Sequence, residues 1–283
     1  MISRQYDWGM RYQRFFMAAG IFVCLIAGAT KNLTCIHTMP AKSDHIRIVY
    51  IANQGYLIEV SDKKVLIDAL HLGVSPELMA TMTSEEPPFD NVNIILATQS
   101  HADHFSPDLV AKYMDKNLGT IFLSSDEAAS HLRAYIHDFA SASQRIKAVY
   151  PMDGEKIKEA VFGVNIQVMN FPINQNSYIT SLGFLVKVGG KKFLHIGDSA
   201  GSLDYLKDYK LSKEKIDVAF IPYWYFTNPD LHSAVKEGIK AKHVIPMYFG
   251  LKEESKDRVT KILKSEFPQA ILLLNELDSK TIQ

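Results

Sequence analysis

Cysteine is scarce in this chain of 283 residues, and charge of neither sign is in excess. The two cysteines, Cys24 and Cys35, are too few for a cysteine-rich zinc site. Lysine and arginine together number 31, as do aspartate and glutamate, so the formal net charge is zero. Proteins that bind nucleic acid usually carry a basic excess that neutralises phosphates, and we therefore expect no nucleic-acid partner. Internal repeats and low-complexity tracts are also missing from the sequence.

The first forty residues differ from the rest of the chain. Three arginines precede an uninterrupted apolar run from Phe15 to Ala29, which ends in the small residues Ala27-Gly28-Ala29. A basic start, a short apolar segment and an end of this type are the parts of a secretory signal peptide. The run is shorter than the roughly 20 apolar residues that a membrane-spanning helix needs. We therefore expect residues 1–29 to be a signal peptide, with an uncleaved membrane anchor as the alternative.

A signal peptide implies export, so we expect the mature protein in the periplasm or outside the cell, with membrane contact only through an uncleaved N-terminal segment. Cleavage removes Cys24 and leaves Cys35 alone, so no internal disulfide is expected although the compartment is oxidising. Lipid attachment at Cys35 is a further alternative. We assign residues 30–45 to a linker and residues 46–283 to a single domain.

Short apolar strands alternate with helical segments through this domain. Hairpin-like strands precede β-α units, and the second half of the domain repeats that order from residue 164. The expected strands are Ile46–Ala52, Tyr56–Val60, Lys64–Ala69, Val92–Ala97, Thr120–Leu123, Val164–Asn170, Gly183–Val188, Lys192–Ile196, Val218–Ile221 and Val244–Met247, and the expected helices begin near Pro107, Ser125, Ser233 and Glu253. Two such halves predict an α/β (α+β) fold in which two packed sheets lie between helices, an αββα sandwich. A parallel doubly wound sheet is the alternative, but its usual glycine-rich phosphate loop is missing.

Two histidines and an aspartate lie within four positions directly after a buried strand, Val92–Ala97. They are His101, Asp103 and His104. Loops at strand ends are where sheet proteins place their functional residues, and imidazole and carboxylate are common ligands of zinc and similar metals. Taken alone, the segment predicts either a metal site or ordinary polar groups at the surface.

The segment Gln99–His104 resembles the H-x-H-x-D-H motif of the metallo-β-lactamase superfamily, with Gln99 in place of the first histidine. The strands at Gly55–Val60 and Lys64–Asp68 are similar to the opening strands of that family, and Lys192–Asp198 is similar to its later glycine-aspartate motif. This resemblance spans about residues 46–274 and implies the αββα fold. It also implies a metal-binding role for Asp198, which bridges two metals in the family.

The chain departs from the family at three metal-ligand positions. Gln99, Asn174 and Tyr248 stand where the resemblance places histidines. The first metal position would then be served by Gln99, His101, Asn174 and a share of Asp198. Because amide oxygens suit calcium or magnesium better than zinc, we expect this position to be empty or weak.

The second metal position keeps more of its ligands. Asp103, His104 and Asp198 are present, with Tyr248 beside them by alignment. This set predicts one divalent ion, zinc or else manganese or iron, and no metal at all is the alternative.

The resemblance implies hydrolysis by a metal-activated water of an ester, lactone, amide or phosphodiester, as in lactonases and phospholipase-D-type hydrolases. We expect Asp198 to orient the water, Asp103 to help hold the metal and Tyr248 to stabilise the developing charge. The alternative is a metal-free, non-catalytic protein that binds a small molecule or a partner in the former active-site cleft.

Further residues are candidates for smaller roles. His71 is a candidate for contact with a small-molecule substrate, although a surface histidine is the preferred interpretation. Tyr223 and Trp224 either wall an apolar substrate pocket or, as we prefer, belong to a loop folded onto the core. For Asp68 we slightly prefer a strand-end cap to a partner of a metal ligand. Strand alternation points His195 away from Asp198, so we expect a structural, hydrogen-bonded histidine.

Overall fold

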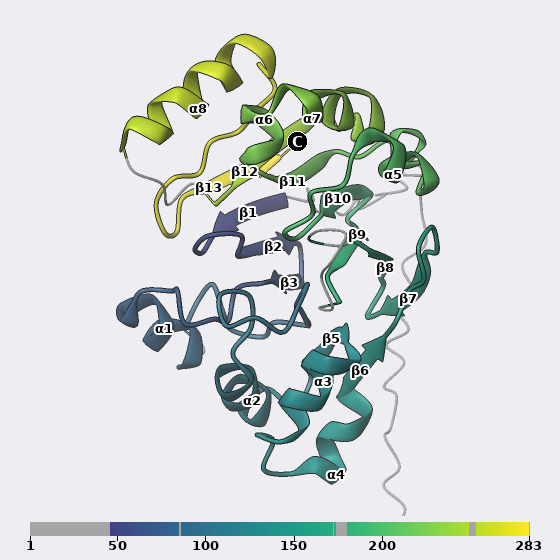
Figure 1. Ribbon diagram of the computed structural model, residues 1–283. Coiled ribbons are helices and arrows are strands. Elements are labelled where there is room, and N and C mark those ends of the chain that lie inside the picture. The colour runs from purple at the N-terminus through teal and green to yellow at the C-terminus, as the bar shows by residue number, and fades with distance from the viewer. Residues whose placement is uncertain (1–45, 85, 172, 174–179, 249–252, 283) are drawn as a thin grey trace, which may run out of the picture. The chain divides into compact units, whose positions relative to one another are not determined.

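The computed structural model describes residues 46–84, 86–171, 173, 180–248 and 253–282 (Figure 1). These residues belong to the second of two compact units, Lys42–Gln283. The predicted signal peptide and linker, both cysteines and Asn174 lie outside the described residues. In the part of the chain that is described, no helix has the length and apolar character needed to cross a membrane.

One sheet has seven strands in the order β13-β1-β2-β3-β4-β5-β6. Its strands are β1 (Ile46–Tyr50), β2 (Tyr56–Val60), β3 (Lys63–Ile67), β4 (Ile94–Leu96), β5 (Ile121–Ser125), β6 (Ile146–Val149) and β13 (Ser279–Ile282). The pairs β13–β1, β1–β2 and β2–β3 are antiparallel, whereas β3 to β6 run parallel. The hairpins followed by β-α units are therefore confirmed.

The other sheet has six strands in the order β12-β11-β10-β9-β8-β7. Its strands are β7 (Ile157–Val161), β8 (Val164–Asn170), β9 (Leu182–Val188), β10 (Lys191–His195), β11 (Val218–Pro222) and β12 (His243–Met247). Strands β7 to β10 are antiparallel, and β10, β11 and β12 are parallel. The second half thus repeats the pattern of the first half, as expected.

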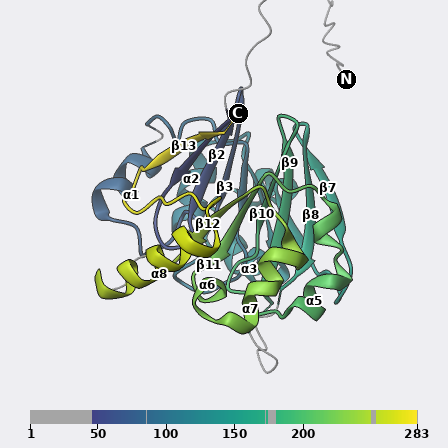
Figure 2. The same ribbon diagram turned by 90° about the horizontal axis from the view of Figure 1, so that it is seen from above.

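The two sheets pack face to face, with helices on their outer faces (Figures 1 and 2). The seven-stranded sheet packs on α1 (Pro76–Thr83), α2 (Pro107–Lys116), α3 (Asp126–Arg133), α4 (Phe139–Ala142) and the 3₁₀ turn η1 (Ser143–Arg145). The six-stranded sheet packs on α5 (Leu203–Asp208), η2 (Leu211–Lys213), α6 (Trp224–Thr227), α7 (Pro229–Ser233), η3 (Ala234–Ile239) and α8 (Glu253–Glu266). The predicted αββα sandwich is confirmed. Instead of one helix over Ser233–Ile239, the chain forms the short α7 and then a π-helical turn, η3.

Alternation along the strands explains this layering. In β2, Tyr56, Ile58 and Val60 point into the core between the sheets, whereas Leu57 points to the helices. Both faces of the strand are buried, which is why its sequence is apolar at almost every position. The same holds for β11, whose five residues are all buried. Polar side chains are therefore collected at the strand ends.

Candidate active site

The candidate site lies where parallel strands of both sheets end. Asp68 follows β3, Thr98 and Gln99 follow β4, Asp198 follows β10 and Tyr248 follows β12. Two backbone hydrogen bonds join these loops across the sheets: Leu182 N–H to Thr98 O at 2.7 Å, and Tyr248 N–H to Asn53 O at 2.9 Å. The sandwich thus brings together residues that are far apart in the sequence.

Several of these loops contain a residue in the left-handed backbone region. The φ angles are 50° at Asn53, 46° at Asp68, 55° at Gly197 and 63° at Tyr248. Glycine adopts this conformation without penalty, but each of the others costs free energy, on the order of 1–3 kcal/mol. Left-handed residues also occur in other turns of the described structure, for example at Ser61 and Lys210, so this conformation does not by itself mark the site. At Tyr248 the hydrogen bond from its N–H to Asn53 O accompanies this backbone conformation.

Asp68 and His104 form the buried floor of the site. Both side chains are fully buried, and Asp68 Oδ2 lies 2.8 Å from His104 Nδ1. The other carboxylate oxygen accepts the backbone N–H of Thr98 at 2.7 Å, and the Thr98 hydroxyl donates to Oδ2 at 2.6 Å. Asp68 therefore caps the loop after β4, as we preferred, and it is also the partner of His104.

Two carboxylates act on the His104 ring. Burial lowers the pKa of this imidazole, but the charges of Asp68 and Asp198 and their hydrogen bonds outweigh burial and raise it to about 10. Burial likewise raises the pKa of the Asp68 carboxyl, and the charge and hydrogen bond of His104 more than offset that effect, so its pKa lies below the ordinary value. The pair is held together by complementary charge in a dry environment.

Three groups face the other nitrogen, His104 Nε2. Asp198 Oδ2 lies at 3.1 Å, the Tyr248 hydroxyl at 3.0 Å and the amide nitrogen of Gln99 at 2.5 Å. The same Gln99 amide donates to Asp198 Oδ2 at 2.8 Å. A protonated Nε2 cannot accept an amide hydrogen, so a proton and the Gln99 amide compete for this nitrogen. We call His104, Asp198, Gln99 and Tyr248 the His104 cluster.

The second metal position fits one ion by its chemistry. A ligating histidine usually donates its other ring N–H to a carboxylate, a backbone carbonyl or water, and Asp68 is such a partner of His104. Asp198 Oδ1 is buried and has no hydrogen-bond partner among the described residues. Asp103 is 56% exposed, and its Oδ2 lies 4.0 Å from His104 Nε2. Within the described ranges no three histidine, cysteine, aspartate or glutamate side chains already stand as a metal site, so ligation requires these groups to shift.

The first metal position does not fit an ion. His101 is exposed, and no side-chain hydrogen bond of its ring to the His104 cluster is found among the residues described. Gln99 turns its amide nitrogen, a donor, toward the cluster, while its Oε1 is buried without a partner in the described structure. Asn174 lies outside the described residues, and among the residues that are described no side chain at this position replaces the missing imidazoles.

Aromatic side chains border Tyr248. The ring of Trp224 lies 5.3 Å from that of Tyr248, at 30°, and Trp224 Nε1 donates to Ser199 O at 3.0 Å. Tyr223 packs edge-on against Trp224, and both are partly exposed. Tyr225 and Phe226 are buried in the core beneath the helices. Tyr223 and Trp224 also pack against this core, as the preferred interpretation expects, and the Trp224 ring borders Tyr248 as well.

The remaining histidines of the region are buried and neutral. His195 donates from Nε2 to Gln54 O at 2.9 Å and accepts from Gly197 N–H, so the predicted structural histidine is confirmed. His71 is fully buried, and its Nδ1 accepts the Gly73 N–H at 3.0 Å, so the preferred interpretation as a surface residue was wrong. Burial lowers the pKa of both rings below the ordinary value.

Sequence reasoning missed two contributors to the site. Thr98 ties Asp68 to the loop after β4, and its hydroxyl lies 3.0 Å from His104 Nδ1. Ser199 holds Trp224 through its backbone oxygen and contacts the Tyr225 hydroxyl at 3.2 Å. A signal existed in the sequence, because each directly precedes or follows a motif residue: Thr98 comes before Gln99, and Ser199 comes after Asp198.

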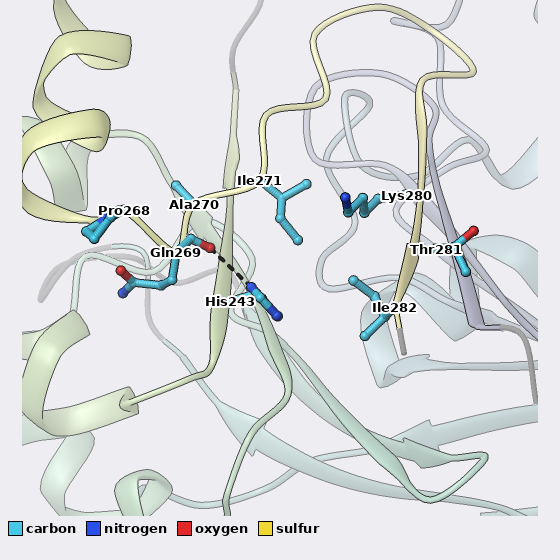
Figure 3. A pocket seen from close by; sticks show the side chains of 8 residues that line it. All are labelled: His243, Pro268, Gln269, Ala270, Ile271, Lys280, Thr281 and Ile282. Atoms are coloured by element: carbon cyan, nitrogen blue, oxygen red, sulfur yellow. Dashed lines mark hydrogen bonds between the residues drawn. The ribbon is translucent and has the colours of Figure 1, made fainter.

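An open hollow of about 600 Å³ lies elsewhere in the fold (Figure 3). It is lined by His243 at the start of β12, Gln269 and Ile282, and His243 Nδ1 lies 3.4 Å from Gln269 O. Tyr248 follows the opposite end of β12, so this hollow is not part of the candidate site. Its lining also lacks a carboxylate or a second histidine.

Comparison with known proteins agrees with this geometry. Residues 47–248 match the model of the beta-lactamase superfamily domain. A UPF0173 metal-dependent hydrolase of Pyrococcus abyssi is 26% identical over 210 residues, which cover 72% of this chain and 84% of that protein. A metallo hydrolase of Ignicoccus hospitalis has a similar structure (TM-score 0.55, 16% identity, 84% of this chain and 99% of that chain). The diiron β-hydroxylase CmlA of Streptomyces venezuelae also has a similar structure, with a TM-score of 0.57 and 14% identity; the match covers 85% of this chain and 54% of that chain. At these identities the structures establish the fold alone, and a single fold serves more than one reaction.

Proposed function

Because the chain belongs to the metallo-β-lactamase superfamily, we propose that it is a metal-dependent hydrolase that acts at the His104 cluster. The observation that carries this proposal is the buried Asp68–His104–Asp198 chain with the Tyr248 hydroxyl on the same histidine nitrogen. Buried titratable groups that shift one another's pKa are typical of catalytic sites. The matched relatives are themselves named metal-dependent hydrolases.

Asp103, His104 and Asp198 would hold one divalent ion, with Tyr248 beside it. We propose zinc, or else manganese or iron, because one imidazole and two carboxylates suit these metals. When bound, such an ion supplies acidity to a water molecule, whose pKa falls from near 16 toward about 7. Asp68 fixes His104 with its Nε2 toward the ion, as a carboxylate behind a ligating histidine does.

The side chains of Asp198 and Tyr248 then transfer protons and stabilise charge. Asp198 Oδ1, which has spare acceptor capacity among the described groups, takes the proton of the attacking water. The new bond joins the water oxygen to a carbonyl carbon or a phosphorus atom, and the Tyr248 hydroxyl donates a hydrogen bond to the oxygen that gains negative charge. The bond to the leaving alcohol or amine breaks, and Asp198 returns the proton to it. Substrates of this chemistry are esters, lactones, amides and phosphodiesters.

Tyr223 and Trp224 favour a small-molecule substrate with an apolar part. Both rings are partly exposed. The Trp224 ring lies beside Tyr248 and is fixed by the hydrogen bond from its Nε1 to Ser199 O, and the Tyr223 ring packs against it. Aromatic walls with a few polar groups are the usual lining of small-molecule sites. His71 does not contribute to this proposal, because its ring is buried and accepts a hydrogen bond from Gly73 N–H.

Turnover on a substrate panel tests the proposal. Residues 46–283 are assayed with aryl esters, lactones and phosphodiesters, with zinc or manganese added, beside Asp198→Asn and the exposed control Asp204→Asn. We expect hydrolysis by the wild type and the control, and a loss of at least about 100-fold in Asp198→Asn, because an essential acid–base group typically contributes that much. Absence of metal-stimulated hydrolysis across the panel, or equal rates in Asp198→Asn, refutes the proposal.

A metal-free binding protein is the second candidate. The contact of the Gln99 amide with both His104 and Asp198 favours it, because these two groups are partnered without a metal. In that case a small molecule binds beside Trp224 and no substrate of the panel is hydrolysed. Ligand-induced quenching of tryptophan fluorescence without turnover would favour this candidate.

Export is a separate proposal that rests on residues 1–29. Expression of the full chain, followed by cell fractionation and mass measurement, tests it. We expect a periplasmic or secreted protein that has lost the N-terminal segment, and full-length protein in the membrane fraction would favour the uncleaved anchor.

A further inference from the structure

Gln99 occupies an unusual place in the His104 cluster. Its side chain is fully buried, and its amide nitrogen lies 2.8 Å from Asp198 Oδ2 and 2.5 Å from His104 Nε2. These two atoms are themselves 3.1 Å apart. One amide group therefore stands in front of both atoms that an ion at the second position would take.

The chemistry of the amide matches that place. The carboxylate oxygen of Asp198 accepts hydrogen bonds, and so does an imidazole nitrogen with a free lone pair. His104 Nε2 is an acceptor only in the neutral ring that keeps its proton on Nδ1. In that form the NH₂ group of glutamine has two hydrogens, one for Nε2 and one for Asp198 Oδ2. A metal ion would satisfy the same two atoms by its charge. The amide does so without charge, and it comes from the chain itself.

The distances also exclude an ion while the amide stays. Ligand atoms about 2.0–2.2 Å from an ion stand roughly 3 Å or more apart. The amide nitrogen is closer than that to both of its neighbours. An ion can therefore enter only if the amide withdraws.

We propose that Gln99 is a stand-in for the metal: its amide closes the His104 cluster in the metal-free protein, and an incoming ion must displace it. The inference rests on the metal position of the proposed function, but not on turnover. It makes Gln99 a determinant of metal affinity rather than a ligand. Removing the amide then has two opposite effects, because the metal-free protein loses stability while the metal binds more tightly.

The experiment measures both quantities on one set of variants. The protein expressed from the full chain is stripped of metal with a chelator, dialysed and titrated with zinc alone, and unfolding temperatures are recorded with and without zinc. The variants are Gln99→Ala and Gln99→Met, since methionine keeps the volume of glutamine and protects the fold. Gln54→Ala is the matched control, because Gln54 is also fully buried and donates to a backbone oxygen, that of Asp103, instead of the cluster.

We expect both Gln99 variants to lower the unfolding temperature of the metal-free protein and to raise zinc affinity about tenfold, which corresponds to about 1.4 kcal/mol. Gln54→Ala is expected to lower the unfolding temperature without a gain in affinity. Weaker zinc binding in Gln99→Met would identify Gln99 as a ligand and overturn the inference. Unchanged affinity in both variants, or no zinc binding by any protein in the set, would overturn it as well. Zinc binding as expected without hydrolysis of any substrate would count only against the proposed function.

Discussion

Replacement of Asp68 by asparagine removes one charge from the floor of the site and keeps its shape. The carboxylate now accepts three hydrogen bonds: from Thr98 N–H at 2.7 Å, from the Thr98 hydroxyl at 2.6 Å and from His104 Nδ1 at 2.8 Å. An amide has a single acceptor oxygen, which can keep the bond to Thr98 N–H. Its NH₂ group then faces His104 Nδ1–H, and two donors oppose each other.

This mismatch between two donors lowers the free energy of unfolding. A hydrogen bond to a charged group contributes about 1.5–3 kcal/mol, and part is regained if the His104 ring becomes neutral and keeps its proton on Nε2 instead of Nδ1. We expect Asp68→Asn to lower the free energy of unfolding by about 2 kcal/mol, or roughly 4–8 °C in the unfolding temperature. A proton on Nε2 also blocks a metal ligand, so zinc affinity is expected to fall about 10- to 100-fold.

Urea unfolding of the metal-free protein and zinc titration at pH 7 measure the two effects. Asp90→Asn is the matched control, because Asp90 Oδ1 lies 2.7 Å from Lys64 Nζ in a pair near the surface. That change is expected to lower the free energy of unfolding by no more than about 1 kcal/mol and to leave zinc affinity unaltered. A stability loss in Asp68→Asn no larger than that of the control would refute the assigned role of Asp68.

Three further predictions concern neighbouring residues. Trp224→Ala removes the ring beside Tyr248, and we expect the KM of an apolar substrate to rise about tenfold with an unchanged circular dichroism spectrum; an unaltered KM would reject the aromatic wall. Burial lowers the pKa of His195, so the unfolded chain takes up a proton below about pH 6.5 that the folded chain refuses, and stability falls as the pH drops below that value. His195→Gln should make this fall shallower between pH 7 and pH 5 in urea unfolding, while His71 keeps part of it; an unchanged slope would contradict the assignment. In Gly183→Ala the new Cβ would lie 1.9 Å from the Phe171 ring, so we expect a loss of about 1–3 kcal/mol, against none in Gly119→Ala, where a Cβ meets nothing; equal unfolding temperatures for the two variants would argue against this packing.

Much of the fold was accessible from the sequence, because the alternation of apolar residues is a local property. The layering of β2 and the continuous burial of β11 follow directly from such patterns. The motif after β4 and the Gly197-Asp198 pair, read through the family resemblance, predicted that His104 and Asp198 belong to one site, and the structure places them 3.1 Å apart.

The contacts of the site were less accessible, because they depend on side-chain directions between distant segments. No local pattern shows that the Gln99 amide reaches Asp198, 99 positions later in the chain. Nor does one show that His71 is buried, since its neighbours Leu72 and Gly73 are ordinary loop residues. The left-handed backbone of Tyr248 is likewise set by its bond to Asn53, a tertiary contact.

Metal content, measured on the protein expressed from the full chain, is the most direct test of a metal-dependent hydrolase built on the His104 cluster. The protein is purified without chelator, soaked in zinc or manganese and freed of excess metal. Its metal content is then measured by inductively coupled plasma mass spectrometry. We expect about one ion per chain, as a single-metal site requires, and its loss in Asp103→Ala and Asp198→Ala. No bound ion under either condition, or an ion that persists in Asp198→Ala, would contradict a metal-dependent hydrolase built on the His104 cluster.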